Sequence, residues 1–380
     1  MKNRIELKDL GRQYKMHKRR IDKTIKGVIQ STSFISGKEV EVLEQQLADY
    51  VGVEHCITCA NGTDAMTLVL MAWNIGTGDA VFVPDFTFFA TAEVVSLRGA
   101  TPIFVDVNEK TFNMDVADLE KAILEVKEAG QLTPKVVIPV DLFGLPADYD
   151  AIDMVAKKYK LLVLEDAAQG FGGSINGKKA CSFGDAATTS FFPAKPLGCY
   201  GDGGAIFTQD SELADVLKSL RVHGKGENKY DNVRIGTNSR LDTIQAAILI
   251  EKLAVLDVEL EVVNRIAKAY NQSIASILFK PIIPSNYFSS YAQYTLICES
   301  FEQRRYLIND LKNKGIPTSV FYPKVLSRQK AFENYPSNIR VNLASITLAD
   351  RVLSIPIHPY LTKKEIDYIV HVINEVVTTS

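Results

Sequence analysis

Strand-like and helix-like segments alternate through the first half of the chain, and this alternation restricts the fold more than any other feature. Short apolar, β-prone segments recur between residues 56 and 208, and amphipathic stretches separate most of them. This pattern predicts an α/β fold with a mostly parallel sheet that carries helices on both faces. The expected strands are Cys56–Ala60, Ala80–Val83, Pro102–Val105, Val136–Val140, Leu161–Leu164, Ala187–Phe192 and Ala205–Thr208, with helices at Asp64–Trp73, Ala90–Leu97, Val116–Ala129 and Tyr149–Tyr159.

The remaining segments predict an N-terminal arm and a smaller C-terminal domain. Ser36-Gly-Lys-Glu39 fits a capping box that would begin a helix ending at Tyr50. No glycine or proline occurs from Leu241 to Ser276, which predicts one long connecting helix. We therefore expect an arm and large domain over residues 1–250 and an α+β domain over 251–380. Its elements would be strands at Gln293–Cys298 and Thr318–Tyr322 and helices at Phe301–Lys314 and Lys363–Val377.

Charge and composition exclude several classes of function. The net charge is −2, which gives no electrostatic reason to expect nucleic acid or an anionic membrane as partner. We see neither a signal peptide nor a run of eighteen apolar residues, and expect a cytoplasmic protein. The five histidines are scattered without ligand spacing, so no metal site is expected. Cys56 and Cys59 lie in a β-prone run, one on each side of a strand, and are expected to be structural rather than a redox pair.

A lysine between two prolines is the first candidate for chemistry. The segment from Ser190 to Gly204 reads Ser-Phe-Phe-Pro-Ala-Lys-Pro-Leu-Gly-Cys-Tyr-Gly-Asp-Gly-Gly. Neither proline suits a helix interior, so Lys195 is expected on a constrained loop between two strands. Desolvation lowers the pKa of such a lysine, and its free amine forms Schiff bases. The alternative is a surface lysine in a turn.

Two polar motifs follow expected strands. Asn61-Gly-Thr-Asp64 lies between the first strand and its helix, where backbone amides, the helix dipole and a threonine hydroxyl could bind phosphate. A plain helix cap explains the same residues. Glu165-Asp166 follows an apolar strand at the edge where α/β sheets bind ligands, so one of these carboxylates could be functional. A solvated strand end is the alternative.

Two further motifs each have a functional and a structural interpretation. The aromatic residues of Phe86-Thr-Phe88-Phe89 could stack on a planar ligand, although single aromatics are usually core. Arg240 could bind a carboxylate or phosphate, or it could be solvated beside a helix that Asn238 caps. Taken together, a phosphate site, a carboxylate, a stacking ring and a loop lysine are the contacts that pyridoxal phosphate needs.

The motifs occur in an order and spacing that resemble the sugar aminotransferases of nucleotide-sugar pathways (the DegT/DnrJ/EryC1/StrS family, fold-type I enzymes dependent on pyridoxal phosphate). The resemblance runs essentially end to end. It implies an aspartate aminotransferase-like fold and a ping-pong transfer from L-glutamate to a nucleotide-linked keto sugar, in polysaccharide or O-antigen biosynthesis. It rests on Asn61-Gly-Thr-Asp-Ala65, Thr87-Phe-Phe-Ala-Thr91, Glu165-Asp-Ala-Ala-Gln169, Ser190-Phe-Phe-Pro-Ala-Lys195 and Asn238-Ser-Arg-Leu-Asp242.

The resemblance also implies a role for each matching residue. Lys195 would be catalytic and hold the cofactor as a Schiff base, and Asp166 rather than Glu165 would pair with the ring nitrogen. Arg240 and Tyr322 would contact the substrate. Active sites shared across a homodimer are implied, because Asn238 resembles a phosphate ligand that comes from the neighbouring subunit. The other cofactor contacts would be Gly62, Thr63, Asp64, Phe88, Gln169 and Ser190.

Within the family, the sequence around the lysine and Ser290-Tyr-Ala-Gln-Tyr-Thr295 are most similar to enzymes that aminate UDP-2-acetamido-2-deoxy-3-keto-D-glucuronic acid. Arg240 would then face the uronate carboxylate. That subgroup usually has His-Tyr where this chain has Phe321-Tyr322, and phenylalanine cannot donate a hydrogen bond. A dTDP- or UDP-linked 3- or 4-keto-(deoxy)hexose is therefore the alternative substrate. A non-catalytic regulatory protein that retains the fold is a further alternative.

Overall fold

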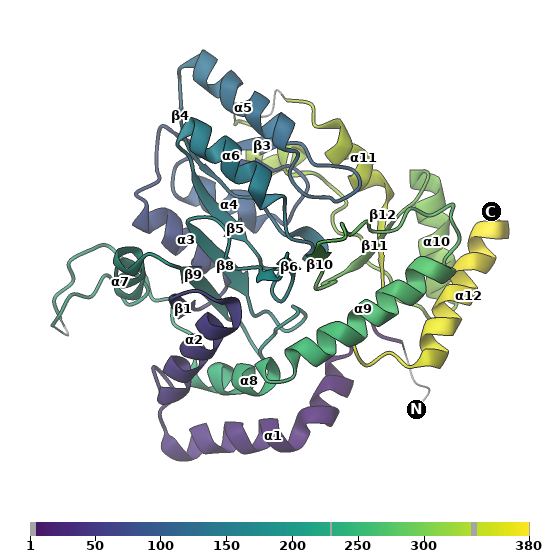
Figure 1. Cartoon of the computed structure of the whole chain (residues 1–380), viewed down its shortest axis with the longest axis horizontal. Helices are drawn as coiled ribbons and strands as arrows, with labels where there is room; N and C mark the ends of the chain where they lie inside the picture. Colours follow the sequence, from purple (N-terminus) through teal and green to yellow (C-terminus); the bar gives the residue numbers. More distant parts are fainter. Residues whose placement is uncertain (1–4, 229, 336–339, 380) are drawn as a thin grey trace.

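A seven-stranded sheet forms the centre of the larger part of the molecule (Figure 1). The computed structural model describes residues 5–228, 230–335 and 340–379. Along the sheet the strand order is β1-β9-β8-β5-β4-β2-β3. Every neighbouring pair is parallel except the two pairs that β9 makes. The strands are β1 (His55–Cys59), β2 (Asp79–Pro84), β3 (Thr101–Val105), β4 (Thr133–Val137), β5 (Leu162–Asp166), β8 (Ala186–Ser190) and β9 (Gly204–Thr208).

All seven predicted strands are present, and the prediction of a mostly parallel sheet is confirmed. Helices α3, α4 and α7 cover one face, and α5 and α6 cover the other together with α2 and α8. Cys59 packs on the face covered by α3, α4 and α7, and Cys56 packs on the opposite face, as predicted for a strand buried on both faces. The helices are α2 (Lys38–Val51), α3 (Gly62–Ala72), α4 (Ala90–Leu97), α5 (Val116–Ala129), α6 (Tyr149–Tyr159), α7 (Ser211–Leu220) and α8 (Thr243–Leu253).

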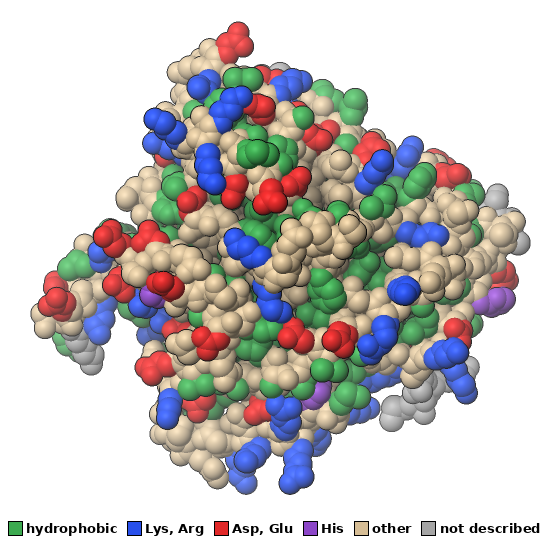
Figure 2. Space-filling model, viewed as in Figure 1, with side chains coloured by type: hydrophobic (Ala, Val, Ile, Leu, Met, Phe, Trp, Pro, Cys, Tyr) green, Lys and Arg blue, Asp and Glu red, His purple; other side chains and the backbone are tan. Residues whose placement is uncertain are grey.

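The C-terminal part has its own apolar core around a two-stranded antiparallel sheet. Ile5, from the N-terminal arm, is buried in this core. Helix α1 then runs beside α8 in Figure 1, and Lys and Arg side chains gather over it in Figure 2. The elements are α1 (Leu10–Ser31), α9 (Leu256–Ser273), α10 (Phe301–Asn313), α11 (Leu343–Arg351), α12 (Lys363–Thr379), β11 (Tyr294–Ile297) and β12 (Val352–Ile355), and a small sheet between the parts pairs β10 (Tyr287–Phe288), β6 (Ser174–Ile175) and β7 (Lys178–Lys179).

Three local predictions are wrong. The expected single helix from Leu241 to Ser276 breaks at residues 254–255 into α8 and α9, because its first half packs on the sheet and its second half joins the C-terminal core. The expected strand Thr318–Tyr322 pairs only at Ser319, which exchanges backbone hydrogen bonds with Ser354 of β12. Helix α2 begins after Gly37 without a side-chain cap, so the capping box at Ser36 does not form.

None of the described helices is both long and apolar enough to span a bilayer.

Candidate active site

Lys195 lies in the loop that joins β8 to β9, at the edge of the sheet where the parallel strands end. The loop is tightly folded: Lys195 N donates to Phe192 O (2.9 Å), and Phe191 N donates to Gly203 O (2.7 Å). Gly198 has no room for a side chain, since a Cβ there would lie 2.5 Å from Pro193 O. Burial lowers the pKa of the Lys195 amine, and the charge of Asp166 partly opposes this shift. The predicted constrained loop is therefore present, and it favours the uncharged amine.

Asp166 ends β5, two strands away from β9. Its Oδ2 accepts a hydrogen bond from Thr91 Oγ1 (2.9 Å), and its Oδ1 accepts from Ala168 N (3.2 Å). Burial raises the pKa of Asp166, while these donors and the Lys195 amine lower it. Since Asp166 and Lys195 each influence the pKa of the other, the amine and the acid belong to one site. Glu165 points elsewhere and accepts backbone hydrogen bonds from Cys181 and Phe183.

The start of α3 forms an open cradle beside the lysine loop. Asn61 caps this helix by accepting Asp64 N (2.8 Å), so the cap is Asn61 rather than Thr63 or Asp64. The amides of Gly62 and Thr63 have no protein acceptor among the described residues. A Cβ on Gly62 would lie 2.8 Å from Ser190 Cβ. Glycine therefore keeps a gap between the helix N-terminus and the Ser190 hydroxyl, which suits an anion.

The aromatic motif divides between core and site. Phe86 is buried, and Phe89 packs against Phe332 with ring centroids 5.3 Å apart. Phe88 is 55% exposed, and its ring lies 6.0 Å from that of Tyr322. Of the three aromatics, only Phe88 is free to stack on a ligand.

Gln169 and Tyr322 meet at the same site from distant parts of the chain. Gln169 Nε2 donates to the Tyr322 hydroxyl (3.2 Å), and Gln169 Oε1 accepts Phe143 N (2.8 Å). Burial raises the pKa of Tyr322. The structure thus joins a predicted cofactor residue to a predicted substrate residue. Phe321 contributes a partly buried ring, which has no hydrogen-bonding group, to a neighbouring apolar cluster.

Asn238 and Arg240 are not brought to Lys195 within the described chain. Asn238 is exposed, Arg240 is half-buried, and neither side chain has a hydrogen bond to another described residue. Between them, Ser239 is buried and its Oγ accepts Ala60 N (3.1 Å). This contact fixes the backbone of the segment against the end of β1 while leaving its two polar side chains unpaired.

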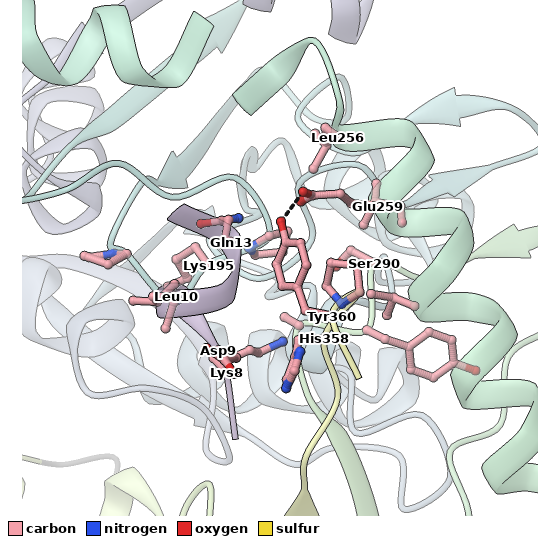
Figure 3. Close-up of a pocket in the computed structure, with 18 residues that line it drawn as sticks. Lys8, Asp9, Leu10, Gln13, Lys195, Leu256, Glu259, Ser290, His358 and Tyr360 are labelled. Atoms are coloured by element: carbon pink, nitrogen blue, oxygen red, sulfur yellow. Dashed lines mark hydrogen bonds between the residues drawn. The ribbon is translucent and has the colours of Figure 1, made fainter. Parts of the chain in front are cut away.

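A small cavity of about 50 Å³ opens on another side of the lysine loop (Figure 3). Tyr360 donates a hydrogen bond to Glu259, and the buried ring of His358 lines the same cavity. Burial lowers the pKa of His358 to about 4, which keeps its ring neutral. The sequence did not reveal the residues that line this cavity, because they come from the N-terminal arm, α9 and a C-terminal loop. Its polar and charged residues are Lys8, Asp9, Gln13, Lys195, Glu259, Ser290, His358 and Tyr360.

Comparison with known proteins places these features in a family. The profile of the DegT/DnrJ/EryC1/StrS aminotransferase family matches residues 15–374. A Pseudomonas aeruginosa protein named UDP-2-acetamido-2-deoxy-3-oxo-D-glucuronate aminotransferase is 45% identical over 96% of this chain and 98% of its own.

Solved structures agree. A DegT DnrJ EryC1 StrS aminotransferase from Brucella abortus superimposes with a TM-score of 0.94 at 48% identity, over 98% of this chain and 99% of that one. The protein ntda from Bacillus subtilis, solved with bound cofactor PMP, gives a TM-score of 0.87 at 29% identity, over 95% and 82% of the two chains.

Proposed function

Because the chain belongs to the DegT/DnrJ/EryC1/StrS aminotransferase family, we propose that it transfers an amino group from L-glutamate to the keto carbon of UDP-2-acetamido-2-deoxy-3-keto-D-glucuronic acid. The observation that carries this proposal is the proximity of the Lys195 amine to the buried acid Asp166, since each shifts the pKa of the other. The 45% identity to the Pseudomonas aeruginosa enzyme supports the choice of sugar.

The residues around Lys195 fit pyridoxal phosphate. Gly62, Thr63 and Ser190 would hold its phosphate, since the helix start is open there and a Cβ on Gly62 would close it. The backbone N–H of Asp64 already donates to Asn61, the cap of α3. Asp64 would complete this helix start. Phe88 would stack on the ring, Asp166 would bind the ring nitrogen, and Gln169 would lie near the phenolic oxygen. When bound, the cofactor supplies an electron sink for the charge left by loss of a proton next to the amino group.

The side chains of this protein would then do the following. Lys195 would hold the cofactor through Nζ, and its free amine would take the α-proton of L-glutamate. Burial lowers the pKa of that amine, which favours the uncharged form that can act as a base. Asp166, oriented by Thr91, holds a proton at the ring nitrogen. The same residues would then act on the keto sugar, with the steps of the first half-reaction in reverse order. This gives ping-pong kinetics with 2-oxoglutarate as the first product.

Substrate recognition would involve Tyr322 and Arg240. The guanidinium of Arg240 suits a uronate carboxylate, with which it can form two parallel hydrogen bonds. Phe321 supports the alternative substrate, a dTDP- or UDP-linked 3- or 4-keto-(deoxy)hexose, because it offers no hydrogen bond to a carboxylate or hydroxyl.

A homodimer is part of the proposal, with Asn238 and Arg240 acting in the partner's site. The segment that precedes them projects beside α7 in Figure 1, and Val233 and Ile235 on it are 55% and 91% exposed. Apolar side chains this exposed suit burial against a second copy. We also propose a cytoplasmic enzyme with a cofactor-binding domain at residues 1–250 and a small domain at 251–380, consistent with their separate cores.

The test is optical and uses purified protein loaded with pyridoxal phosphate. L-Glutamate should bleach its yellow colour, and among a panel of UDP- and dTDP-linked keto sugars the 3-keto uronate should restore it fastest. Lys195→Ala should fold, bind cofactor and show no turnover. Restoration by a non-uronate sugar alone would favour the alternative substrate. No bleaching by any amino acid, or turnover by Lys195→Ala at the wild-type rate, would refute the proposal.

A further inference from the structure

Two more carboxyl groups, those of Asp141 and Glu165, lie buried next to Asp166. Both residues are 0% exposed. Glu165 precedes Asp166 on β5, and Asp141 follows β4 at the same edge of the sheet, where its backbone N donates to Asp166 O (3.0 Å). Neither carboxyl group has a part in the proposed reaction. Two buried acids this close to the site therefore need an explanation.

The protein supplies hydrogen-bond donors to three of their four oxygens. Glu165 Oε1 and Oε2 accept the backbone N–H groups of Cys181 (2.7 Å) and Phe183 (2.8 Å). Asp141 Oδ1 accepts Ala147 N (3.0 Å) and the Tyr149 hydroxyl (2.8 Å). Asp141 Oδ2 is buried and receives no N–H or O–H donor from the described residues.

The fourth oxygen has room only because residue 170 is glycine. A Cβ there would lie 2.3 Å from Asp141 Oδ2. The carboxyl groups of Asp141 and Glu165 lie close enough for each to shift the pKa of the other. A hydrogen bond between two carboxyl groups requires a proton on one of them. Glu165 is therefore the neighbour that can supply the donor missing from Oδ2.

Among the described residues, no lysine, arginine or histidine contributes to the pKa shift of either acid. The titratable groups around it are Tyr149, Asp166 and Cys181, with Tyr287 also influenced by Asp141. Burial raises the pKa of Asp141 to about 7, and burial with the Asp141 charge raises that of Glu165 well above its ordinary value. Two adjacent buried carboxylates cannot both ionise without a compensating cation.

We propose that Asp141 and Glu165 share one proton, held on Glu165 and donated to Asp141 Oδ2, and that the pair positions Asp166 and Gln169. Asp141 bonds to the backbone of Asp166 and opens the turn Leu142–Gly144. Phe143 in that turn donates to Gln169 Oε1. Displacement of Asp141 would therefore move both residues. The positioning role rests on the proposed function, whereas the shared proton does not.

The shared proton is tested with Asp141→Asn in the full-length protein. The asparagine oxygen can keep both donors of Oδ1, and its NH₂ group can donate to Glu165 without an extra proton. At about pH 6, wild type minus D141N should show the infrared carbonyl band of a protonated carboxylic acid, because free carboxyls are ionised there. Asp367→Asn, an exposed acid on α12, is the control and should leave the band unchanged.

Stability against pH gives a second readout of the proton. The pKa of the pair is raised in the folded state, so its contribution to stability is complete below the unfolded carboxyl pKa of about 4 and is lost as pH rises toward 7. Over that range the unfolding equilibrium constant of wild type should rise about tenfold per pH unit relative to D141N. Equal slopes in the two proteins would overturn the shared proton.

Positioning is tested by kcat. D141N should keep kcat within about twofold of wild type, since its hydrogen bonds persist, whereas Asp141→Ala should lose about tenfold or more with a smaller change in KM. In the alanine variant, the pH titration of the cofactor absorbance should also shift. If D141N is as impaired as D141A, the positioning role is wrong.

If D141A does not fold, a third variant still tests the proposal. Glu165→Gln should be less stable than D141N, because its NH₂ group would face a backbone N–H of Cys181 or Phe183. Equal stability would contradict the direction of the proton. An inactive wild type with the expected infrared band would refute the proposed function and leave the shared proton standing.

Discussion

Thr91 Oγ1 donates a 2.9 Å hydrogen bond to Asp166 Oδ2, and so connects the first turn of α4 to the acid at the end of β5. Both residues are buried, so water cannot replace this donor easily. The hydrogen bond lowers the pKa of Asp166 against the effect of burial. It therefore helps to keep the acid charged.

Thr91→Val removes this donor while keeping the shape of the side chain. The pKa of Asp166 should rise, and the acidic limb of the kcat profile should move to higher pH because a smaller fraction of Asp166 is ionised at each pH. A loss of about tenfold in kcat is expected for a buried hydrogen bond to a charged group. Thr91→Ser, which keeps the hydroxyl, should restore most of the rate. A pH profile identical to that of wild type would show that Thr91 does not control Asp166.

Gly62→Ala should weaken cofactor binding, because the new Cβ would lie 2.8 Å from Ser190 Cβ and would narrow the cradle. We expect a rise of about tenfold in the Kd for pyridoxal phosphate, measured by absorbance titration of cofactor-free protein. Gly27→Ala is the matched control, since nothing lies within 4 Å of its Cβ position on α1. That change should leave the Kd unaltered and add about 0.5–1 kcal/mol of stability. Equal Kd values for the two variants would rule out Gly62 as part of the cradle.

Tyr322→Phe deletes the hydroxyl that accepts the hydrogen bond from Gln169. Bleaching by L-glutamate should change little, whereas kcat/KM for the sugar should fall about 5- to 10-fold, as expected for one neutral hydrogen bond. Stopped-flow absorbance separates the two half-reactions. Tyr306→Phe on α10, whose ring is 52% exposed, is the control. Equal losses in both half-reactions would assign Tyr322 to the cofactor rather than to the sugar.

Arg240→Ala should discriminate between sugars. If the guanidinium binds the uronate carboxylate, kcat/KM should fall about 10- to 100-fold with a uronate and only a few-fold with a sugar that lacks the carboxylate. Parallel steady-state assays measure this ratio. A uniform loss with both sugars would show that Arg240 has another role.

Acid should weaken the contact between α1 and α12. Arg12 donates two hydrogen bonds to Glu365 (2.8 and 2.6 Å), which lower the pKa of Glu365 to about 2. This contribution is complete above the unfolded carboxyl pKa of about 4.3 and is lost as pH falls toward 2. The Tm difference between wild type and Glu365→Gln should be largest near neutral pH and should vanish in acid. Glu302→Gln, an exposed acid on α10, should show no such trend.

Much of this arrangement was predictable from local sequence. Buried parallel strands give continuous apolar runs, which located all seven strands. The position of Asp166 directly after such a strand predicted its role, and the two flanking prolines predicted the constrained loop of Lys195. The same reasoning could have found Asp141, which follows the apolar run that ends at Val140.

The errors arise where tertiary contacts outweigh local pattern. No residue type signals the break between α8 and α9, which occurs because the two helices join different cores. Thr318–Tyr322 has β-prone residues, but only Ser319 reaches the edge of β12 that β11 leaves free. The cavity in Figure 3 combines segments more than 300 residues apart, so no sequence window contains it.

The antiparallel strand β9 has a consequence for how this loop can change. Ser190 pairs with Gly204, so both ends of the lysine loop are held by adjacent strands, and Gly204 itself is pressed against Asn61 with no space for a Cβ. An added or deleted residue between them cannot be absorbed by slippage at either end. The resulting shift of the backbone would displace the Lys195 amine. We therefore expect the length of this loop to vary less than the identity of its residues.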